Sequence, residues 1–269
     1  MAVRMFVTDL DGTLLNKEHR ISAENKKAVQ EAAAAGVVVT IATGRMYESA
    51  LPYAQELGVD VPIITYNGAL IRSAAGKEYF SSYLEPQDCR DILAFCQEKD
   101  WYVQIYSDGV LYFVEETPEA MAYEAAAGIK GQAVGRQGLQ KHCSHAPKML
   151  VIFADSSFTD EAAACLTKKF AGRITAVKSN PNYIEIIKPG VNKASALRQL
   201  AAMLDIPEAE TMAIGDSNND LSMLRAAGQS VAMGNAGPEI KAAADYETAA
   251  CDADGVAAAI RQYVLGRER

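Results

Sequence analysis

The chain has 269 residues, 49% of them hydrophobic and 22% charged, which is enough to bury a substantial core in one large domain or two smaller ones. A formal net charge of −8 and the lack of any Lys/Arg-rich run argue against nucleic acid as a partner. No stretch is apolar for long enough to span a bilayer, and the start of the chain lacks signal-peptide features. Five cysteines without a CxxC pair favour reduced thiols, so we expect a cytoplasmic protein.

The first segments alternate between strand-like and helix-like composition, which predicts βαβ units around a parallel sheet. Ser22 is suited to cap the first helix, and Gly36 is suited to end it. In chain order we expect a strand at Met5–Thr8, a helix at Ala23–Ala35, a strand at Val37–Thr43, a helix near Ser49–Leu57 and a strand at Pro62–Tyr66.

A different pattern begins near Tyr83. Two short strands flank Ser107-Asp108-Gly109, a hairpin signal that parallel sheets do not use, and this predicts a separate α+β module. Its expected elements are strands at Val103–Tyr106 and Leu111–Val114, a helix near Pro118–Ala127, a strand at Lys148–Ala154, a helix near Thr159–Phe170, and strands near Ile174–Val177 and Tyr183–Ile187.

The alternating pattern resumes after Pro189-Gly190, so the module interrupts the first domain. The predicted division is a core of residues 1–82 and 189–269 with an insertion of residues 83–188, and the fold class is α/β with a parallel sheet. The expected elements are a helix at Lys193–Leu204, a strand at Thr211–Ile214, a helix at Asn219–Ala227, a strand at Ser230–Met233 and two C-terminal helices.

Two carboxylates stand at the end of the first strand, in the segment DLDGT. Asp9 and Asp11 are two residues apart, so in an extended segment their side chains point the same way. Ligands of open α/β sheets bind at the carboxyl ends of the strands, and a divalent cation relieves the repulsion between two such carboxylates. A polar turn closed by Asp-Gly is the structural alternative, and for this motif alone it stays open.

A second acidic cluster, GDSNND at Gly215–Asp220, follows another predicted strand. Asp216 is placed to bind a metal, while Asn219 and Asp220 open the next helix, whose N-terminal N–H groups favour anions. A group of helix-capping residues is the alternative.

Two weaker signals lie at other element ends. Thr43-Gly44-Arg45 follows a predicted strand and offers a hydroxyl and an exposed backbone N–H to phosphate oxygens. Lys193 begins a helix, where its ammonium could neutralise a phosphoryl group, although a lone lysine is usually a solvated surface residue.

The four motifs together, DLDGT, Thr43-Gly44, Lys193 and GDSNND, resemble those of the haloacid dehalogenase-like superfamily. The length, the insertion and the stretches YNGALI at Tyr66 and VAMGNA at Val231 are similar to its Cof-type hydrolases. This resemblance implies a Rossmann-like core with an inserted cap domain after the third strand.

The resemblance also implies the chemistry and the cofactor, Mg²⁺. Asp9 would attack phosphorus and form an aspartyl-phosphate, and Asp11 would act as general acid and then as general base. The main-chain carbonyl of Asp11 and the carboxylate of Asp216 would bind Mg²⁺ together with Asp9. Phosphate oxygens would be held by the Leu10 N–H, Thr43, Gly44, Lys193 and Asn219, with Asp220 orienting Lys193 or a metal-bound water.

Further residues are candidates for substrate contacts. Arg45, Asn67 and Asn235 follow predicted strands near the motif ends. Tyr102, Gln104 and Tyr106 alternate with apolar residues along one predicted strand of the insertion, so they share one face. We expect this face to contact the leaving group of the substrate, with ordinary partly exposed strand residues as the alternative.

The reaction expected from these features is hydrolysis of a small phosphate ester, such as a sugar phosphate, a nucleotide or a phosphorylated cofactor. A haloalkanoate dehalogenase needs no acid at the position of Asp11, which favours phosphoryl transfer. A phosphotransferase or mutase on the same fold, and a catalytically idle binding module, stay open as alternatives. A Rossmann-type redox enzyme is disfavoured because no GxGxxG follows the first strand.

Overall fold

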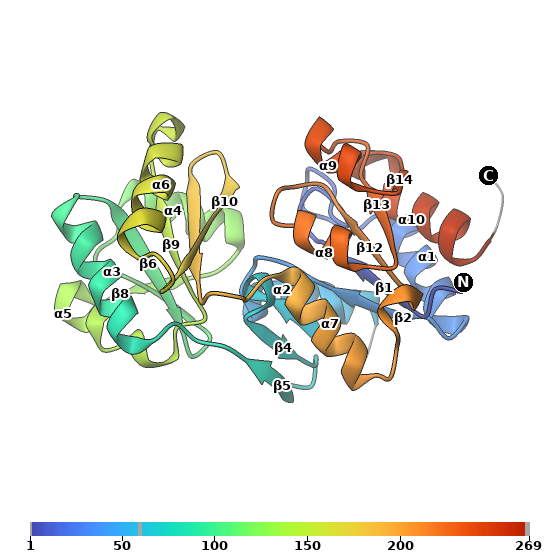
Figure 1. The fold of residues 1–269 in the computed structure, drawn as a ribbon, viewed down its shortest axis with the longest axis horizontal. Helices are drawn as coiled ribbons and strands as arrows, with labels where there is room; N and C mark the ends of the chain where they lie inside the picture. Colours follow the sequence, from blue (N-terminus) through green and yellow to red (C-terminus); the bar gives the residue numbers. More distant parts are fainter. Residues whose placement is uncertain (1, 59–60, 267–269) are drawn as a thin grey trace. The chain divides into compact units, whose positions relative to one another are not determined.

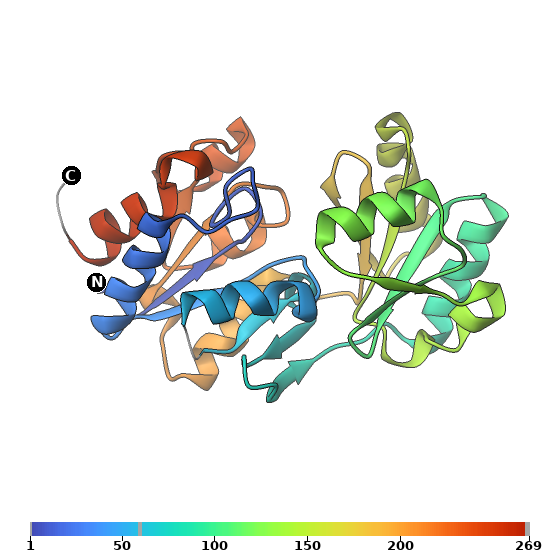
Figure 2. The ribbon, with the colours of Figure 1, turned by 180° about the vertical axis from the view of Figure 1, so that it is seen from behind.

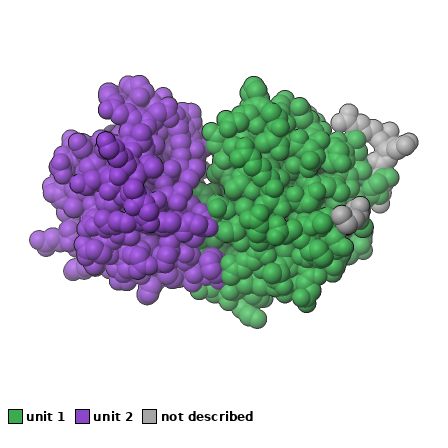
Figure 3. Space-filling view, in the orientation of Figure 1, with its two compact units in different colours: residues 1–44, 50–79, 192–269 green, residues 45–49, 80–191 purple. Residues whose placement is uncertain are grey.

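The computed structural model describes residues 2–58 and 61–266 (Figure 1). The chain divides into two compact units (Figure 3). The first comprises Met1–Gly44, Ala50–Tyr79 and Asn192–Arg269, and the second comprises Arg45–Ser49 and Phe80–Val191. No helix in the described residues is both long and apolar enough to cross a membrane.

The first unit is built on a five-stranded parallel sheet with the order β14-β13-β12-β1-β2. Strand β1 is an interior strand and entirely buried, and its Met5 lies opposite Val38 on one side and Thr211 on the other. A parallel bridge from Ala42 to Ile64 brings β3 alongside β2. The strands are β1 (Met5–Thr8), β2 (Val38–Ile41), β3 (Ile63–Thr65), β12 (Thr211–Gly215), β13 (Gln229–Ala232) and β14 (Tyr246–Glu247).

Helices cover both faces of this sheet. Helices α7 and α8 lie over one face and α1 and α10 over the other (Figures 1 and 2). Ser22 caps α1 by accepting a hydrogen bond from the Asn25 N–H at 3.0 Å, as expected. The helices that contribute to this unit are α1 (Ala23–Ala34), α2 (Tyr47–Leu57), α7 (Lys193–Met203), α8 (Leu221–Ala226), α9 (Pro238–Ala243) and α10 (Gly255–Ala259).

The second unit contains a six-stranded sheet with the order β10-β11-β9-β6-β7-β8, antiparallel except between β7 and β8. Helices α3 and α6 cover one face, and α4 lies on the other (Figures 1 and 2). The elements are α3 (Pro86–Glu98), β6 (Tyr102–Ser107), β7 (Val110–Phe113), α4 (Pro118–Ala127), β8 (Gly131–Ala133), α5 (Gly135–Gln140), β9 (Lys148–Ile152), α6 (Thr159–Lys169), β10 (Thr175–Asn180) and β11 (Tyr183–Ile187).

The expected hairpin is confirmed. Strands β6 and β7 pair antiparallel and are joined by Asp108 and Gly109, which have φ values of 50° and 77°. Positive φ at both central residues is the requirement of the tight turns whose twist matches that of the strands. The fold class is α/β, with a parallel-sheet core and an inserted α+β part. The exact domain limits 1–82, 83–188 and 189–269 stay a prediction.

Several short elements were not expected. Strands β4 (Leu70–Arg72) and β5 (Glu78–Ser81) extend β3 into a small sheet, and β8, α5 and β14 are equally short. Elements this short contain too few residues for a period to show. The expected helix start at Asn219 is wrong, because α8 begins at Leu221. The preceding residues form a turn closed by the Asp220 N–H and the Ser217 carbonyl at 2.9 Å.

Candidate active site

The candidate site lies where the central strands of the first unit end. Asp9 follows β1 and Asp216 follows β12, and these strands pair with Thr8 opposite Ile214. The Asp9 N–H continues the ladder by donating to the Ile214 carbonyl at 3.1 Å. Sheet register therefore places these two carboxylates side by side, although the residues are far apart in sequence.

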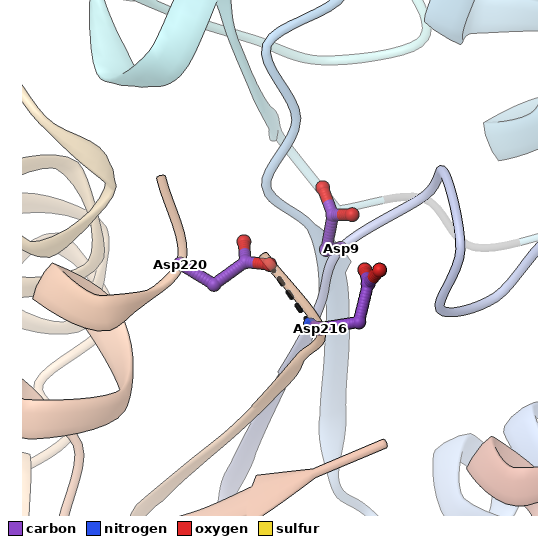
Figure 4. A group of neighbouring side chains, drawn as sticks. All are labelled: Asp9, Asp216 and Asp220. Carbon is purple, nitrogen blue, oxygen red and sulfur yellow. Dashed lines mark hydrogen bonds between the residues drawn. The ribbon is translucent and has the colours of Figure 1, made fainter. Parts of the chain in front are cut away.

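Three carboxylates converge at this edge. One oxygen each from Asp9, Asp216 and Asp220 lies within 4.8 Å of the others. Figure 4 shows Asp9 and Asp216 at the strand ends and Asp220 approaching from the segment before α8. Asp9 is 4% exposed and Asp220 is fully buried. Like charges this close and this dry repel one another strongly.

Lys193 supplies a cation at this carboxylate cluster. Its Nζ lies 2.6 Å from Asp9 Oδ1 and 2.6 Å from Asp220 Oδ1, and the side chain is fully buried. Asn192 caps α7, because its Oδ1 accepts from the Ser195 N–H at 2.9 Å while its own N–H donates to Ser195 Oγ at 3.1 Å. This cap fixes Lys193 as the first residue of the helix, so its ammonium is part of the site rather than solvated.

The pKa shifts reflect an excess of negative charge. Burial raises the pKa of Asp9 well above its ordinary value, and the other carboxylates add to this effect while Lys193 opposes it. Burial and the charge of Asp220 raise the pKa of Asp216 to about 6. Burial alone would lower the pKa of Lys193, but Asp220 and Asp9 outweigh it and raise that pKa. One ammonium does not balance the three acids.

Asp216 is held in a fixed orientation. Thr13 Oγ1 donates to Asp216 Oδ1 at 2.9 Å. Asn235 Nδ2 donates to the Gly12 carbonyl at 2.8 Å and approaches Asp216 Oδ2 at 3.4 Å, while its Oδ1 accepts from the Cys251 N–H at 2.9 Å. Asn235 therefore links three loops around this carboxylate.

The turn after Asp11 leaves no room for a side chain at Gly12. Its φ is +73°, and a Cβ there would lie 2.5 Å from Asp216 Oδ2. Glycine is thus required both by the left-handed backbone and by the close approach of the carboxylate. The Asp-Gly turn and the acidic cluster form one structure.

The carboxylates differ in what they still offer to a ligand. Asp220 Oδ1 binds Lys193, and its Oδ2 accepts from the N–H groups of Asp216 and Ser217, both at 3.0 Å. Asp9 and Asp216 are less occupied. Their carboxylate oxygens, their proximity and their raised pKa values fit a hard divalent cation such as Mg²⁺, which prefers oxygen ligands.

A polar row beside the carboxylates connects three other expected site residues. Asn219 Nδ2 donates to Asn67 Oδ1 at 3.1 Å, and the Asn67 N–H donates to the Thr43 carbonyl at 3.0 Å. Asn67 has a φ of 55° and is buried. The structure therefore brings Thr43, Asn67 and Asn219 together in the first unit.

Asp11 is the least buried acid of the DLDGT turn, with a side chain 45% exposed. His19 Nδ1 lies 3.6 Å from Asp11 Oδ1. Sequence reasoning missed His19, Thr13 and Asn192 as neighbours of the site. Thr13 belongs to DLDGT and Asn192 precedes Lys193, so position in the motif could have indicated both, whereas His19 carries no such signal.

Four of the remaining expected contacts, Arg45, Tyr102, Gln104 and Tyr106, belong to the second unit. Arg45 Nη1 donates to Ser49 Oγ at 3.3 Å. Tyr102 OH donates to Gln104 Oε1 at 2.8 Å, and Gln104 Nε2 donates to Tyr106 OH at 3.0 Å. Gln104 and Tyr106 are fully buried. Their contact with a leaving group stays a prediction.

Known proteins share both the sequence and the fold of this chain. Residues 6–260 match the family described as haloacid dehalogenase-like hydrolase. Phosphatase YwpJ of Bacillus subtilis is 32% identical over 278 residues, which cover 95% of this chain and 98% of that protein. The 5-amino-6-(5-phospho-D-ribitylamino)uracil phosphatase YwtE of the same organism is 31% identical, with 98% and 99% covered.

A solved structure extends the likeness to three dimensions. TM0651 of Thermotoga maritima superposes with a TM-score of 0.84 at 30% identity, and the alignment covers 97% of each chain. Agreement across the whole length includes both the parallel-sheet core and the inserted part. The chain belongs to the haloacid dehalogenase superfamily as a Cof-type hydrolase, and it is a phosphatase.

Proposed function

We propose that this phosphatase hydrolyses small phosphate monoesters with Mg²⁺ as cofactor and Asp9 as nucleophile, through an aspartyl-phosphate. The observation that carries the proposal is the environment of Asp9, a buried carboxylate held by Lys193 at 2.6 Å beside Asp216. A carboxylate in this position is oriented, largely dehydrated and close to cationic stabilisation, as nucleophilic attack on an anionic ester requires.

Asp9, Asp216 and the main-chain carbonyl of Asp11 would hold Mg²⁺. When bound, the ion neutralises negative charge on the phosphate and on the carboxylates. The raised pKa values of Asp9 and Asp216 support this assignment, because they measure the cost of keeping both acids ionised without further positive charge. Asp220 would remain outside the metal shell, since one of its oxygens binds the Lys193 ammonium and the other accepts from two backbone N–H groups.

The phosphate group would be bound by residues around the carboxylate cluster. Lys193 would neutralise a phosphate oxygen while keeping Asp9 in line, and Asp220 would hold Lys193 in place. The remaining oxygens would accept hydrogen bonds from the Leu10 N–H, Thr43, Gly44 and Asn219. The polar row from Thr43 through Asn67 to Asn219 supports this grouping.

Asp11 would give a proton to the leaving oxygen and then remove one from the attacking water. Its side chain is about half exposed, in contrast to Asp9, and this difference supports separate roles for the two acids. After giving its proton to the leaving oxygen, Asp11 is the carboxylate that the second step needs, and the proton it takes from water restores the acid.

The substrate proposal is a small phosphate ester of a sugar, nucleotide or cofactor. It is supported by the relative YwtE, whose named substrate carries a phosphate on a ribityl chain. The proposed contacts to the rest of the substrate are Asn67 and Asn235 in the core, together with Arg45. In an inserted cap of residues 83–188 they are Tyr102, Gln104 and Tyr106. Cytoplasmic location is proposed because the five cysteines are free thiols.

The central experiment compares the purified protein with Asp9→Asn and Asp11→Asn on an aryl phosphate, with and without Mg²⁺. Asp9→Asn should lower kcat by at least about 10³-fold, because the nucleophile is gone. Asp11→Asn should slow release of the phosphoryl group, so that mass spectrometry after acid quenching finds phosphate on the peptide containing Asp9. Equal activity of the wild type and Asp9→Asn would overturn the assignment of Asp9 as the nucleophile.

A product assay separates hydrolysis from transfer. Hydrolysis yields inorganic phosphate in proportion to substrate consumed, even when a sugar acceptor is added. A phosphotransferase would instead move phosphate to the acceptor at the expense of inorganic phosphate, and that result would replace the hydrolase proposal.

A further inference from the structure

The second unit contains a cavity of about 330 Å³, and Tyr102 is the only expected substrate contact in its lining. It lies where the end of α3, the start of β6, the segment after β7 and helix α5 meet. Every residue that lines it belongs to the second unit. The volume is within the range of sites for small organic ligands.

The cavity has an apolar floor and aromatic walls. Leu93, Val103 and Leu139 are buried core residues that line it. The Trp101 and Phe153 rings, also in the lining, meet edge to face with centroids 5.4 Å apart. Trp101 lines the cavity and is only partly buried, so part of its indole surface is accessible. Aromatic surface of this kind, and that of tryptophan above all, attracts organic cations.

Acidic side chains dominate the charged part of the lining. Asp100, Glu115 and Glu119 contribute three carboxylates, against a single guanidinium from Arg136. Among the described residues, none of these four side chains forms an ion pair. No ion pair with a described residue neutralises these carboxylates, so the cavity favours a positively charged ligand.

We propose that this cavity is a binding site for a small organic ammonium ion with an apolar body. The apolar part would rest on Leu93, Val103 and Leu139, and the ammonium would lie between Trp101 and the carboxylates of Glu115 and Glu119. Dehydrated apolar surface supplies the affinity, and the combined aromatic and acidic wall selects the charge.

The cavity wall continues into the interior of the unit. Tyr102 lines the cavity, and its hydroxyl starts the hydrogen-bonded row that runs through Gln104 and Tyr106 to the Tyr123 hydroxyl on α4. Burial and the charges of Glu119 and Glu124 raise the pKa of Tyr102, which places acidic side chains close to its phenol. A ligand in the cavity would thus contact one end of the row that supports α4.

Trp101 makes the site directly measurable, because it is the only tryptophan in the chain. The experiment follows its fluorescence during titration with 2-phenylethylammonium at neutral pH and physiological salt. The matched probes are neutral 2-phenylethanol and anionic 3-phenylpropionate, which keep the aromatic body. The cation should give a saturable change, with an affinity about tenfold higher than that of the alcohol, and the anion should bind least.

Two double variants separate the site from general surface charge. Glu115→Gln/Glu119→Gln removes two lining carboxylates and should weaken binding of the cation about tenfold. Glu98→Gln/Glu116→Gln removes the same charge from neighbouring positions outside the lining, and its affinity should stay within about twofold because exposed charges are screened.

Three results would overturn the proposal. The first is that the fluorescence of Trp101 shows no saturable response to the cation. The second is that the alcohol binds as tightly as the cation, and the third is that both double variants weaken binding of the cation equally. All probes can be used on the whole chain without phosphate substrate, so the outcome is independent of the proposed phosphatase chemistry.

Discussion

The two units bury polar side chains in opposite ways. In the first, Asp9 and Asp220 share the ammonium of Lys193, and Asp216 adds a third carboxylate. In the second, the buried Lys148 pairs with the buried Glu185 at 3.2 Å. The first cluster has three acids for one ammonium, whereas Lys148 and Glu185 form a pair of opposite charges.

Neutral polar side chains lie beside the buried pair in the second unit. Tyr106, Gln104 and Tyr123 satisfy one another by hydrogen bonds, and Lys148 Nζ lies 4.7 Å from the centre of the Tyr106 ring. Burial raises the pKa of the Tyr106 phenol, so it stays uncharged. A cluster of buried polar side chains therefore does not by itself indicate a catalytic site. An excess of buried negative charge does indicate one, because a bound cation would neutralise it.

The largest expected effect comes from removing the cation of the unbalanced cluster. Lys193→Met would leave buried carboxylates without their ammonium, and we expect activity to fall by at least about 10³-fold. The free energy of unfolding of the metal-free protein should fall by about 3–5 kcal/mol, as measured by urea denaturation. Lys178→Met removes an exposed pair with Asp160 and should cost less than about 1 kcal/mol. Equal losses in the two variants would contradict the assignment of Lys193.

Neutralising an acid should have opposite signs in the two clusters. Glu185→Gln removes the carboxylate from its buried pair with Lys148 and should lower the free energy of unfolding by about 2–3 kcal/mol. Asp9→Asn relieves repulsion and should raise that free energy in metal-free protein by about 1 kcal/mol, while activity is lost. Denaturant midpoints of both variants test the comparison, and the same sign for both would break it.

The pH dependence of metal-free protein should reveal the excess charge. The pKa of Asp216 is about 6 in the folded chain against an ordinary value of 3.8. Between these values the folded state keeps a proton that the unfolded chain has lost, so this contribution to stability is present at low pH and is lost as pH rises through about 6. The contribution of Asp216 to the free energy of unfolding should be about 1–2 kcal/mol, which is less than the full pKa shift would give because solvent screens part of the interaction.

Asp216→Asn provides the control for this titration. The difference in unfolding free energy between wild type and variant, measured in EDTA at several pH values, isolates the contribution of Asp216. It should change between about pH 4 and pH 6 and be flat above that range. A difference in unfolding free energy that does not vary with pH would show that folding does not raise the pKa of Asp216.

The smallest predicted effect concerns orientation rather than charge. Asn235→Ala removes the links to the Gly12 carbonyl and Asp216, and the dissociation constant for Mg²⁺ should rise about tenfold in calorimetry. Asp252→Ala is the matched variant, since Asp252 follows Cys251, a partner of Asn235, and holds Lys17. Its Mg²⁺ affinity should match the wild type, and an equal loss in both variants would show that the effect is not specific to the Asn235 amide.

Much of the fold and the central pair of acids were predictable because they follow from periodicity. Short apolar segments that alternate with helix-like segments identified β1 and β12. Acids that directly follow two strands of one parallel sheet meet at the same edge of that sheet. Lys193 was predictable as the first residue of a helix, although its complete burial was not. Burial depends on which loops close over a side chain, and local sequence does not encode that.

Other features depend on contacts between distant loops. The hydrogen bonds of the Asn235 amide to Gly12 and Cys251 could not be predicted from local sequence. The alternation of Tyr102, Gln104 and Tyr106 correctly indicated a shared face. It gave no sign that α4 would contribute Tyr123 to that face, because a strand's pattern reports polarity and not its covering partner.

The interior position of β1 also sets an order of events during synthesis. Asp9 and Lys193 are separated by 184 residues, and β1 needs β12 on one side to complete its pairing. A ribosome takes on the order of ten seconds or more to make that length of chain. All strands of the six-stranded sheet are made within this interval. The inserted sheet can therefore pair completely while the nascent β1 still has an open edge, and the cluster of Asp9, Lys193 and Asp216 is assembled last.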